Sequence, residues 1–293
     1  MNVKPKLMLG TAQFGMNYGT FNTTGKVKLD EARAILRQAR LSQIDFLDTA
    51  RNYGQSEETL GKIPEASKFN LVTKCPPLSA ASDPIQALED HFEKSLRALN
   101  TNRIYGYLLH RTSDLTSSCG CEIWECLTRL RDSGKIERIG VSAYEADEVV
   151  ALLNVYPMTL IQLPANTLSP WIYEEKYRSL FMERDIEVHT RSTFLQGFLL
   201  AEPDHLPIHL TKWKNVLNEF RAQANTLGMK PLQAALVSII SQPMIDKVVV
   251  GVDNLLQLQQ IIDASVHNER FDPFTFKNLA SSERGLIDPR CWK

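Results

Sequence analysis

Three stretches decide the fold of this chain: IDFLD (44–48), FNLVTK (69–74) and IYGYLLH (104–110). Each is a short apolar run of the kind that forms a buried parallel strand, and each ends in a polar residue able to do chemistry. These residues are Asp48, Lys74 and His110. Because the carboxyl ends of the strands in a parallel barrel meet on one face, the pattern predicts that the three side chains share a rim.

Strand-like runs alternate with amphipathic helical stretches along the whole chain, which indicates repeated βα units. Eight strands are expected, at 7–9, 44–47, 69–73, 104–109, 139–142, 160–163, 186–190 and 247–250. Helices are expected near 29–42, 56–63, 83–100, 122–133, 145–153, 172–184, 212–226 and 254–265. Asp83 before Pro84 marks a helix start, and Gly134 marks a helix end where a left-handed turn is expected.

The predicted fold class is therefore α/β, a (β/α)8 TIM barrel that forms a single domain over residues 1–293. Extended loops are expected after strand seven (191–211) and before strand eight (227–245), at the mouth where barrel enzymes place such insertions. The second of these contains an additional predicted helix at 232–241. The tail from His267 is rich in aromatic residues, so it is expected to pack on the barrel; they are Phe271, Phe274, Phe276 and Trp292.

An open doubly wound sheet is the structural alternative, but it normally shows G-x-G-x-x-G after its first strand. This chain has GTAQFG (10–15) there, which does not fit that spacing. A phosphate-binding P-loop fails at both candidate places. Met16 rather than Lys follows Gly15. The stretch from Gly19 to Gly25-Lys26 has one residue too many between its glycines, and Val27 stands where the motif needs Ser or Thr. Both nucleotide signatures are excluded.

Composition describes an ordinary globular protein: of 293 residues, 43% are hydrophobic and 23% are charged, with a net charge of −1. Without a basic tract, nucleic acid is not expected as a partner. No apolar segment is long enough for a membrane span or a secretory signal, so no membrane partner and a cytoplasmic location are expected. The odd count of five cysteines suits free thiols.

Asp48, Lys74 and His110, together with Tyr53 in the polar stretch that follows Asp48, suggest proton transfer to a carbonyl oxygen. A free tyrosine has a pKa near ~10, and we expect a neighbouring Lys74 ammonium to lower it. Asp48 would keep Lys74 charged. His110 would donate a hydrogen bond to the carbonyl oxygen and stabilise the negative charge that builds there.

A metal-dependent hydrolase on the same fold is a weaker alternative, and no metal site is expected. His205 and His209 are separated by Pro207, so they cannot share a regular helix face. Cys119, Cys121 and Cys126 form the one cysteine cluster, and their spacing matches no standard zinc site.

The stretch FLDTARNYG (46–54), followed by Ser56 and Glu57, resembles the D-T-A-x-x-Y-G-x-S-E signature of the aldo-keto reductase superfamily. Further matches are GTAQFG (10–15), VTK (72–74), LLH (108–110), IGVS (139–142), IQ (161–162) and FLQG (194–197). The resemblance implies an (α/β)8 barrel that binds NAD(H) or NADP(H) in extended form and reversibly reduces an aldehyde or ketone to an alcohol.

Carried over by position, the resemblance makes Tyr53 the proton donor, Lys74 and Asp48 its tuning pair, and His110 the residue that orients the carbonyl. It also implies that the nicotinamide carboxamide is held by Ser142 and Gln162, with backbone from Gly10 and Thr11 nearby, and that the pyrophosphate lies along Gln196 and Gly197. The remaining residues expected along the cofactor are Asp48, Arg191, Ser192, Phe194, Gly251, Asp253, Gln257 and Gln260.

The chain departs from the family pattern at both ends of the expected cofactor site. At the nicotinamide end, Ala143 replaces the usual Asn, and Arg191 stands where an aromatic ring usually stacks. A fixed cation there favours the neutral reduced ring over the oxidised cation. At the adenosine end, Gly251 and Gln257 occupy the basic positions typical of NADP-dependent members, so the NADP-type phosphate anchors are absent and NAD(H) is expected to bind at least as well as NADP(H).

The expected substrate is a small carbonyl compound, and the polar and aromatic character of the expected pocket suits a sugar or another hydroxylated compound. That pocket comprises Phe14, Tyr18, Asn52, Arg111, Asn166 and Trp171, with Phe194 and His205 beside them. The alternative function is a catalytically silent barrel that binds the nucleotide as a sensor or subunit. A matched proton donor argues against it.

Overall fold

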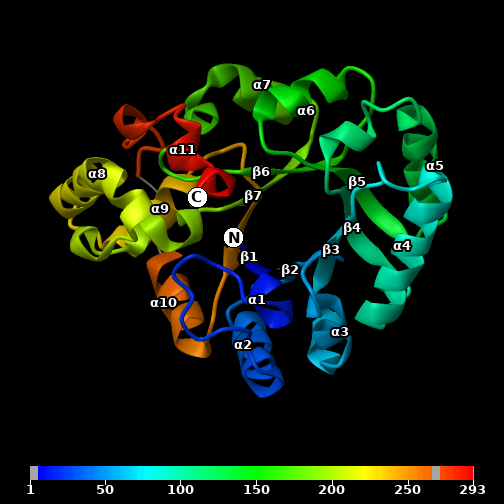
Figure 1. Ribbon diagram of the computed structural model, residues 1–293, viewed down its shortest axis with the longest axis horizontal. Coiled ribbons are helices and arrows are strands. Elements are labelled where there is room, and N and C mark those ends of the chain that lie inside the picture. The colour runs from blue at the N-terminus through cyan, green and yellow to red at the C-terminus, as the bar shows by residue number, and fades with distance from the viewer. Residues whose placement is uncertain (1–5, 266–270, 293) are drawn as a thin grey trace.

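Eight parallel strands close into a barrel in chain order, as the sequence predicts. The computed structural model describes residues 6–265 and 271–292 (Figure 1). The strands are β1 (Leu7–Gly10), β2 (Phe46–Asp48), β3 (Asn70–Cys75), β4 (Ile104–Leu109), β5 (Ile136–Ser142), β6 (Leu160–Pro164), β7 (Glu187–Arg191) and β8 (Lys247–Gly251). Pairing of β1 with β8, which aligns Gly10 with Gly251, closes the barrel.

Helices alternate with the strands around the outside of the barrel (Figure 1). They are α1 (Ala12–Gly15), α2 (Leu29–Leu41), α3 (Ser56–Gly61), α4 (Pro84–Leu99), α5 (Gly120–Asp132), α6 (Ala146–Leu153), α7 (Glu175–Glu183), α8 (Lys214–Thr226), α9 (Pro231–Ile240), α10 (Leu255–Ser265) and α11 (Arg284–Ile287). Short 3-10 helices lie at η1 (Pro64–Lys68), η2 (Thr112–Asp114), η3 (Pro170–Tyr173), η4 (Leu195–Leu200), η5 (Pro203–His205), η6 (Ile208–Trp213), η7 (Lys277–Leu279) and η8 (Pro289–Cys291).

Local sequence signals fix several of these ends. The Asp83 carboxylate accepts hydrogen bonds from the backbone N–H groups of Ile85 and Gln86, and so caps α4 as expected. Gly134 has a φ of 79° just after α5, in the left-handed region that the sequence predicts. The sequence does not reveal α1, because four residues are too few to show a helical period.

The strand ends differ from the sequence prediction in a way that matters for the site. Asp48 and Lys74 lie within β2 and β3 rather than just beyond them, because pairing continues through these polar residues: Asp48 aligns with Val72, and Lys74 aligns with Leu108. Pairing with the neighbouring strands provides hydrogen-bond partners for the backbone groups there. The two side chains are therefore held by the ladder and not by a loop.

Strand periodicity places the polar side chains directly above an apolar layer. Phe46, Val72, Leu108 and Leu160 belong to one buried cluster contributed by several strands. Two residues further along each strand come Asp48, Lys74, His110 and Gln162. Because alternate residues of a strand point to the same face, the apolar layer forms a floor beneath these polar groups.

The segments after β7 and before β8 are long, as expected. Three 3-10 helices (η4–η6) fill the first, and α9 forms within the second close to the predicted helix. With α8 and the C-terminal tail they build a separate apolar cluster that includes Phe276, Leu279 and Leu286, with Phe271 and Trp292 packed against it. The expected packing of the tail is confirmed for the described residues.

No helix in the described ranges is long and apolar enough to cross a membrane. All five cysteines are free thiols. Among residues 6–265 and 271–292, no group of three or more His, Cys, Asp or Glu side chains is arranged to hold a metal ion.

Candidate active site

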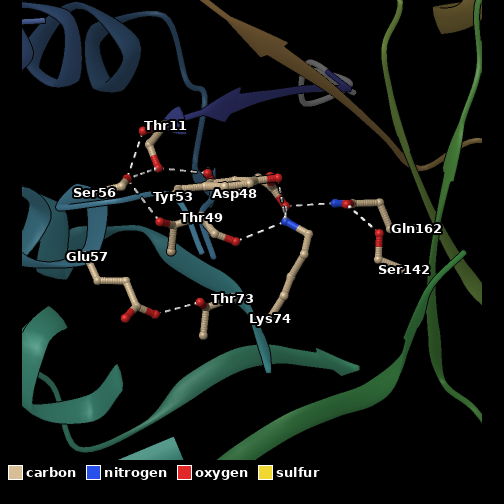
Figure 2. A network of polar contacts seen from close by, with 10 residues as sticks. All are labelled: Thr11, Asp48, Thr49, Tyr53, Ser56, Glu57, Thr73, Lys74, Ser142 and Gln162. Atoms are coloured by element: carbon tan, nitrogen blue, oxygen red, sulfur yellow. Dashed lines mark hydrogen bonds and ion pairs between the residues drawn. The ribbon is translucent and has the colours of Figure 1, made fainter. Parts of the chain in front are cut away.

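Lys74 is the centre of the polar network at the carboxyl end of the barrel (Figure 2). Its Nζ donates to Asp48 Oδ1 at 2.6 Å, to the Thr49 carbonyl at 2.9 Å and to the Tyr53 hydroxyl at 3.5 Å. These three acceptors match the three N–H donors of an ammonium group. Lys74 is fully buried, so the contacts replace its hydration.

Asp48 links this network to the opposite side of the barrel (Figure 2). Its Oδ1 also accepts a hydrogen bond from Gln162 Nε2 at 2.7 Å, and Gln162 Oε1 accepts one from Ser142 Oγ at 3.2 Å. A chain of contacts therefore runs from Ser142 on β5 through Gln162 on β6 to Asp48 on β2.

Tyr53 lies on a bend between β2 and α3, and hydrogen bonds of Ser56 hold this bend in place (Figure 2). Ser56 Oγ donates to the Thr11 carbonyl at 2.7 Å and lies 3.0 Å from Thr49 Oγ1 and 2.8 Å from Thr11 Oγ1. The buried Glu57 accepts from Thr73 at 2.7 Å. The sequence indicates no role for Ser56 and Glu57 beyond their match to the family signature. Their position as a Ser-Glu pair at the start of a helix is the signal that could have indicated a structural role.

His110 follows the end of β4 and faces Tyr53. The two ring centroids are 6.2 Å apart in an edge-to-face arrangement. The Nδ1 atom of His110 is buried without a hydrogen-bond partner in the described part of the chain. The structure thus brings together the four residues that the sequence predicts as an acid–base group, and their individual roles stay predictions.

The environment of these groups sets their charge states. Burial lowers the pKa of Lys74, and the charge of Asp48 and its hydrogen bond oppose that effect, as expected. Burial, helped by the positive charges of Lys74, Arg191 and Arg111, lowers the pKa of His110 to about 3, so its imidazole is neutral at physiological pH. A neutral imidazole retains one N–H to donate.

The expected lowering of the Tyr53 pKa is wrong. Burial raises the pKa of Tyr53 well above its usual range, and the Asp48 carboxylate raises it further. The Lys74 ammonium lies closer to Asp48 Oδ1, at 2.6 Å, than to the Tyr53 hydroxyl, at 3.5 Å, so its charge is compensated mainly by Asp48. Tyr53 consequently holds its proton.

A cavity of about 490 Å³ begins at Asp48 and Tyr53 and extends to the start of α10. Most of the predicted cofactor residues line it: Gly10, Thr11, Asp48, Arg191, Ser192, Phe194, Gln196, Gly197, Gly251, Asp253, Gln257 and Gln260. Ser142 and Gln162 do not line this cavity, because they are buried and bonded to each other and to Asp48.

A strap formed by residues 18–25 crosses the far part of this first cavity. Thr20 donates to Gln196 Oε1 through both its backbone N–H at 3.1 Å and its hydroxyl at 2.8 Å. Asn22 Nδ2 donates to Asp253 Oδ1 at 3.0 Å, and Gln257 Nε2 donates to Asp253 Oδ2 at 3.3 Å. In the described part of the chain, Arg191 is the one Lys or Arg that lines the cavity, and it lies at the Tyr53 end.

A second cavity, of about 660 Å³, adjoins the first and shares Tyr18, Arg191, Ser192 and Gln196 with it. Of the predicted substrate residues, Tyr18 and Trp171 line this second cavity. Phe194 lines the first.

The other predicted substrate residues line neither cavity. Phe14 is fully buried in the main core, because α1 turns it inward. Asn166 is fully buried, and its Oδ1 accepts from the Leu168 N–H at 2.9 Å, so it stabilises a turn. Asn52, Arg111 and His205 are exposed outside both cavities.

Arg191 stacks on a protein ring that the sequence did not indicate. Its guanidinium lies 4.5 Å from the centroid of Tyr144, and its Nη2 donates to the Ala143 carbonyl at 3.1 Å. Arg290, from the C-terminal tail, lies over the same ring at 3.2 Å. No sequence spacing connects these residues, so only the fold could reveal Tyr144.

Comparison with known proteins agrees with this architecture. The Aldo/keto reductase family profile matches residues 6–283. The oxidoreductase sirO of Leptosphaeria maculans is 30% identical over 179 residues, which cover 60% of this chain and 52% of sirO. The aldo-keto reductase YhdN of Bacillus subtilis is 33% identical over 175 residues, covering 55% of this chain and 50% of YhdN. The matched segment thus spans about half the length of these two relatives.

Among solved structures, an aldo-keto reductase from Bacillus halodurans in its holo form superposes with a TM-score of 0.76 at 20% identity, covering 98% of this chain and 95% of that chain. This likeness supports the closed eight-stranded barrel. Because the family profile spans nearly the whole chain, the protein belongs to the aldo/keto reductase family.

Proposed function

We propose that the protein is a nicotinamide-dependent oxidoreductase that reversibly reduces an aldehyde or ketone to an alcohol. The observation that carries this proposal is the position of Tyr53, whose side chain lines the first cavity beside the buried Lys74–Asp48 pair. His110 lies next to the Tyr53 ring. Tyr53 lines the cavity, and Lys74 and His110, which do not line it, each contact Tyr53.

The residues of the first cavity fit an extended nicotinamide nucleotide. The cavity runs from Tyr53 to Gln260, and Gly10, Gly197 and Gly251 leave its wall without side chains. Gln196 and Gly197 would hold the pyrophosphate, and Ser142 and Gln162 would hold the carboxamide once Gln162 turns from Asp48. When bound, the reduced nicotinamide supplies a hydride to the carbonyl carbon.

The protein residues complete the reduction by handling the oxygen. His110 donates an N–H to the carbonyl oxygen and orients it. As negative charge builds on that oxygen, the Tyr53 hydroxyl transfers its proton to it, and the alcohol forms. The Lys74 ammonium stabilises the phenolate left on Tyr53, while Asp48 keeps Lys74 charged. The raised pKa of Tyr53 keeps the donor protonated before the reaction.

A Tyr53→Phe variant tests this function against a panel of aldehydes and ketones, with cofactor oxidation as the readout. It removes one oxygen from the proton donor, so we expect kcat to fall by at least ~100-fold, in the range of general acid catalysis, with cofactor affinity nearly unchanged. If neither the parent nor the variant oxidises cofactor, the protein binds nucleotide without catalysis, as a sensor or subunit does.

For the cofactor, we propose that NAD(H) binds at least as well as NADP(H). Asp253 already accepts hydrogen bonds from Asn22 and Gln257, and in the described chain no Lys or Arg lines that end of the cavity. A 2′-phosphate would therefore meet a carboxylate without a compensating cation. Fluorescence titration with NADH and NADPH measures the preference, and NADPH binding ten times tighter would contradict it.

For the substrate, we propose a small hydroxylated carbonyl compound such as a sugar aldehyde or keto-sugar. The second cavity combines Trp171 and Tyr18 with many polar groups, a mixture that suits ring stacking and hydroxyl recognition. Turnover across a panel of sugar aldehydes and keto-sugars, compared with unsubstituted aldehydes of equal length, tests this class.

A further inference from the structure

Arg191 is a cation without a carboxylate partner at the junction of the two cavities. Two other arginines line the second cavity, and both are paired: Arg284 with Glu145 at 2.8 Å and Arg290 with Asp288 at 2.6 Å. In the described part of the chain, Arg191 makes no ion pair, and its one hydrogen bond goes to the Ala143 carbonyl. A guanidinium has five N–H donors, so most of its capacity is left for a ligand.

The surrounding residues hold this guanidinium in one place. It stacks on Tyr144, and Arg290 lies over the same ring. Arg290 is in turn fixed by three side-chain hydrogen bonds to Asp288 on the C-terminal tail. The half-buried Arg191 side chain is already ordered, so it loses little conformational entropy when it binds an anion.

The free charge lies beside the reacting group. Arg191 and Tyr53 both line the first cavity, and the positive charge of Arg191 contributes to the lowered pKa of His110. Asp48 compensates Lys74 at 2.6 Å but not Arg191. The charges of Arg191 and of the exposed Arg111 also act on His110, and no described carboxylate pairs with either of them, an imbalance that a bound anion would reduce.

The second cavity is the side from which that anion would come. Tyr144 and Arg290, which fix Arg191, line the second cavity and not the first. The acidic residues on the wall of the second cavity have partners of their own: Asp147 and Glu174 share Lys176, and Glu148 accepts from Thr112. The pyrophosphate is expected at Gln196 and Gly197, of which Gln196 lines both cavities and Gly197 lines the first alone.

We propose that Arg191 binds an acidic group of the substrate, so that the protein acts on aldehydes or ketones that carry a carboxylate or phosphate. The carbonyl oxygen would lie at Tyr53 and His110, and the acidic group would lie against the Arg191 fork. This inference rests on the proposed carbonyl reduction and narrows its substrate class.

Matched pairs of substrates test the proposal with the intact protein and both reduced cofactors. The pairs are para-carboxybenzaldehyde and its methyl ester, succinic semialdehyde and its methyl ester, and glyceraldehyde with and without a phosphate. We expect kcat/KM to be about 10-fold to 100-fold higher for the charged member of at least one pair, the range of a charge-assisted hydrogen-bonded pair. The carboxylate and phosphate pairs show which oxyanion is preferred.

Variants of Arg191 then assign the preference to its charge. Arg191→Gln should remove most of the acid-to-ester preference by raising KM for the charged substrate. Because Arg191 also lines the cofactor cavity, the readout is the ratio of kcat/KM for acid and ester and not the absolute rate on the ester. Arg191→Lys should restore part of it. Arg284→Gln is the matched control, because Arg284 lines the same cavity but is paired with Glu145, and its acid-to-ester ratio should stay unchanged.

The outcomes separate the two proposals. If the parent reduces charged and uncharged members equally well, the anion site is wrong and carbonyl reduction stands. If Arg191→Gln weakens both members equally and weakens NADH binding as well, Arg191 serves the nucleotide instead. If the parent reduces no member of any pair with either cofactor while the Tyr53→Phe panel is also silent, carbonyl reduction itself fails. Circular dichroism and melting temperature identify any variant that does not fold.

Discussion

At the scale of single residues, the site depends on a buried pair whose charges are useful only together. Lys74 has no exposed surface, and Asp48 has almost none. The Asp48 carboxylate raises the pKa of Lys74 against the effect of burial, and Lys74 gives the buried carboxylate a counter-ion. This interdependence explains why a lysine, ordinarily a surface residue, is stable directly above an apolar floor.

A double-mutant cycle measures this coupling. Asp48→Asn leaves the Lys74 charge buried without a counter-ion, so we expect unfolding in urea to become easier by about 3–5 kcal/mol, with activity lost. Lys74→Met should destabilise similarly. The double variant Asp48→Asn with Lys74→Met should recover much of the stability and none of the activity, and strictly additive losses would contradict the pairing.

His110 makes stability depend on pH. Its pKa falls from 6.5 to about 3 on folding, so between these values the unfolded chain binds a proton that the folded protein excludes. The stability associated with His110 is therefore complete above pH 6.5 and is lost as pH falls toward 3. The wild type should lose about 2 kcal/mol more than His110→Gln between pH 7 and pH 5, measured by urea unfolding at each pH. Equal losses in the two proteins would show that the imidazole is not excluded from protonation.

At the scale of elements, the bend between β2 and α3 positions Tyr53, the proposed proton donor. It is packed so closely on α1 that a Cβ at Gly15 would lie 1.8 Å from the Tyr53 carbonyl oxygen. The Gln55 N–H also donates to the Gly15 carbonyl at 3.2 Å. The short α1, which the sequence did not reveal, therefore packs directly against the Tyr53 bend and supports it.

A Gly15→Ala variant tests this contact. The methyl group must push the bend outward, so we expect kcat to fall by at least ~10-fold, because small misplacements of a catalytic group are costly. The matched control is Gly134→Ala, where φ is 79° but a Cβ meets nothing within 4 Å. Backbone strain should lower the stability of this control by about 1–2 kcal/mol while kcat is unchanged. A Gly15→Ala protein with full kcat would mean that the bend adjusts freely.

At the scale of the whole molecule, the two ends of the barrel have different tasks. The carboxyl ends of the strands carry the cavities and the Lys74 network. Glu187, near the amino end of β7, instead contacts His189 at 2.7 Å and Arg138 at 3.6 Å, and it accepts a hydrogen bond from Tyr105. Burial raises the pKa of Glu187, but its hydrogen bonds with His189 and Tyr105 outweigh this and hold the pKa below its usual range.

Glu187→Gln should separate stability from activity. We expect the variant to unfold more easily by about 2 kcal/mol at pH 7, the usual size of a hydrogen bond to a charged group, with kcat/KM within twofold of the parent. Because the folded pKa of Glu187 is lowered, its contribution is present above the pKa of the unfolded chain and declines as pH falls. The difference between the two proteins should therefore shrink at low pH, and a large loss of activity would contradict the division of tasks.

The sequence by itself determined the barrel and the rim. Short apolar runs ending in Asp48, Lys74 and His110 specify strands whose ends converge, because strand formation and the two-residue period depend on neighbours along the chain. Even the error of placing Asp48 and Lys74 just beyond their strands left them on the correct side. Tyr53 was identified in the same way, from its place in a bend after β2.

Only the tertiary structure decided which side chains meet across the barrel. Gln162 is bonded to Asp48, Arg191 stacks on Tyr144, and Phe14 and Asn166 point into the interior rather than into a cavity. The Gln162–Asp48 and Arg191–Tyr144 contacts join strands and loops far apart in the chain, and they form only in the closed barrel. Local patterns carry no information about such distances, because the barrel must close before these groups have any neighbours to choose between.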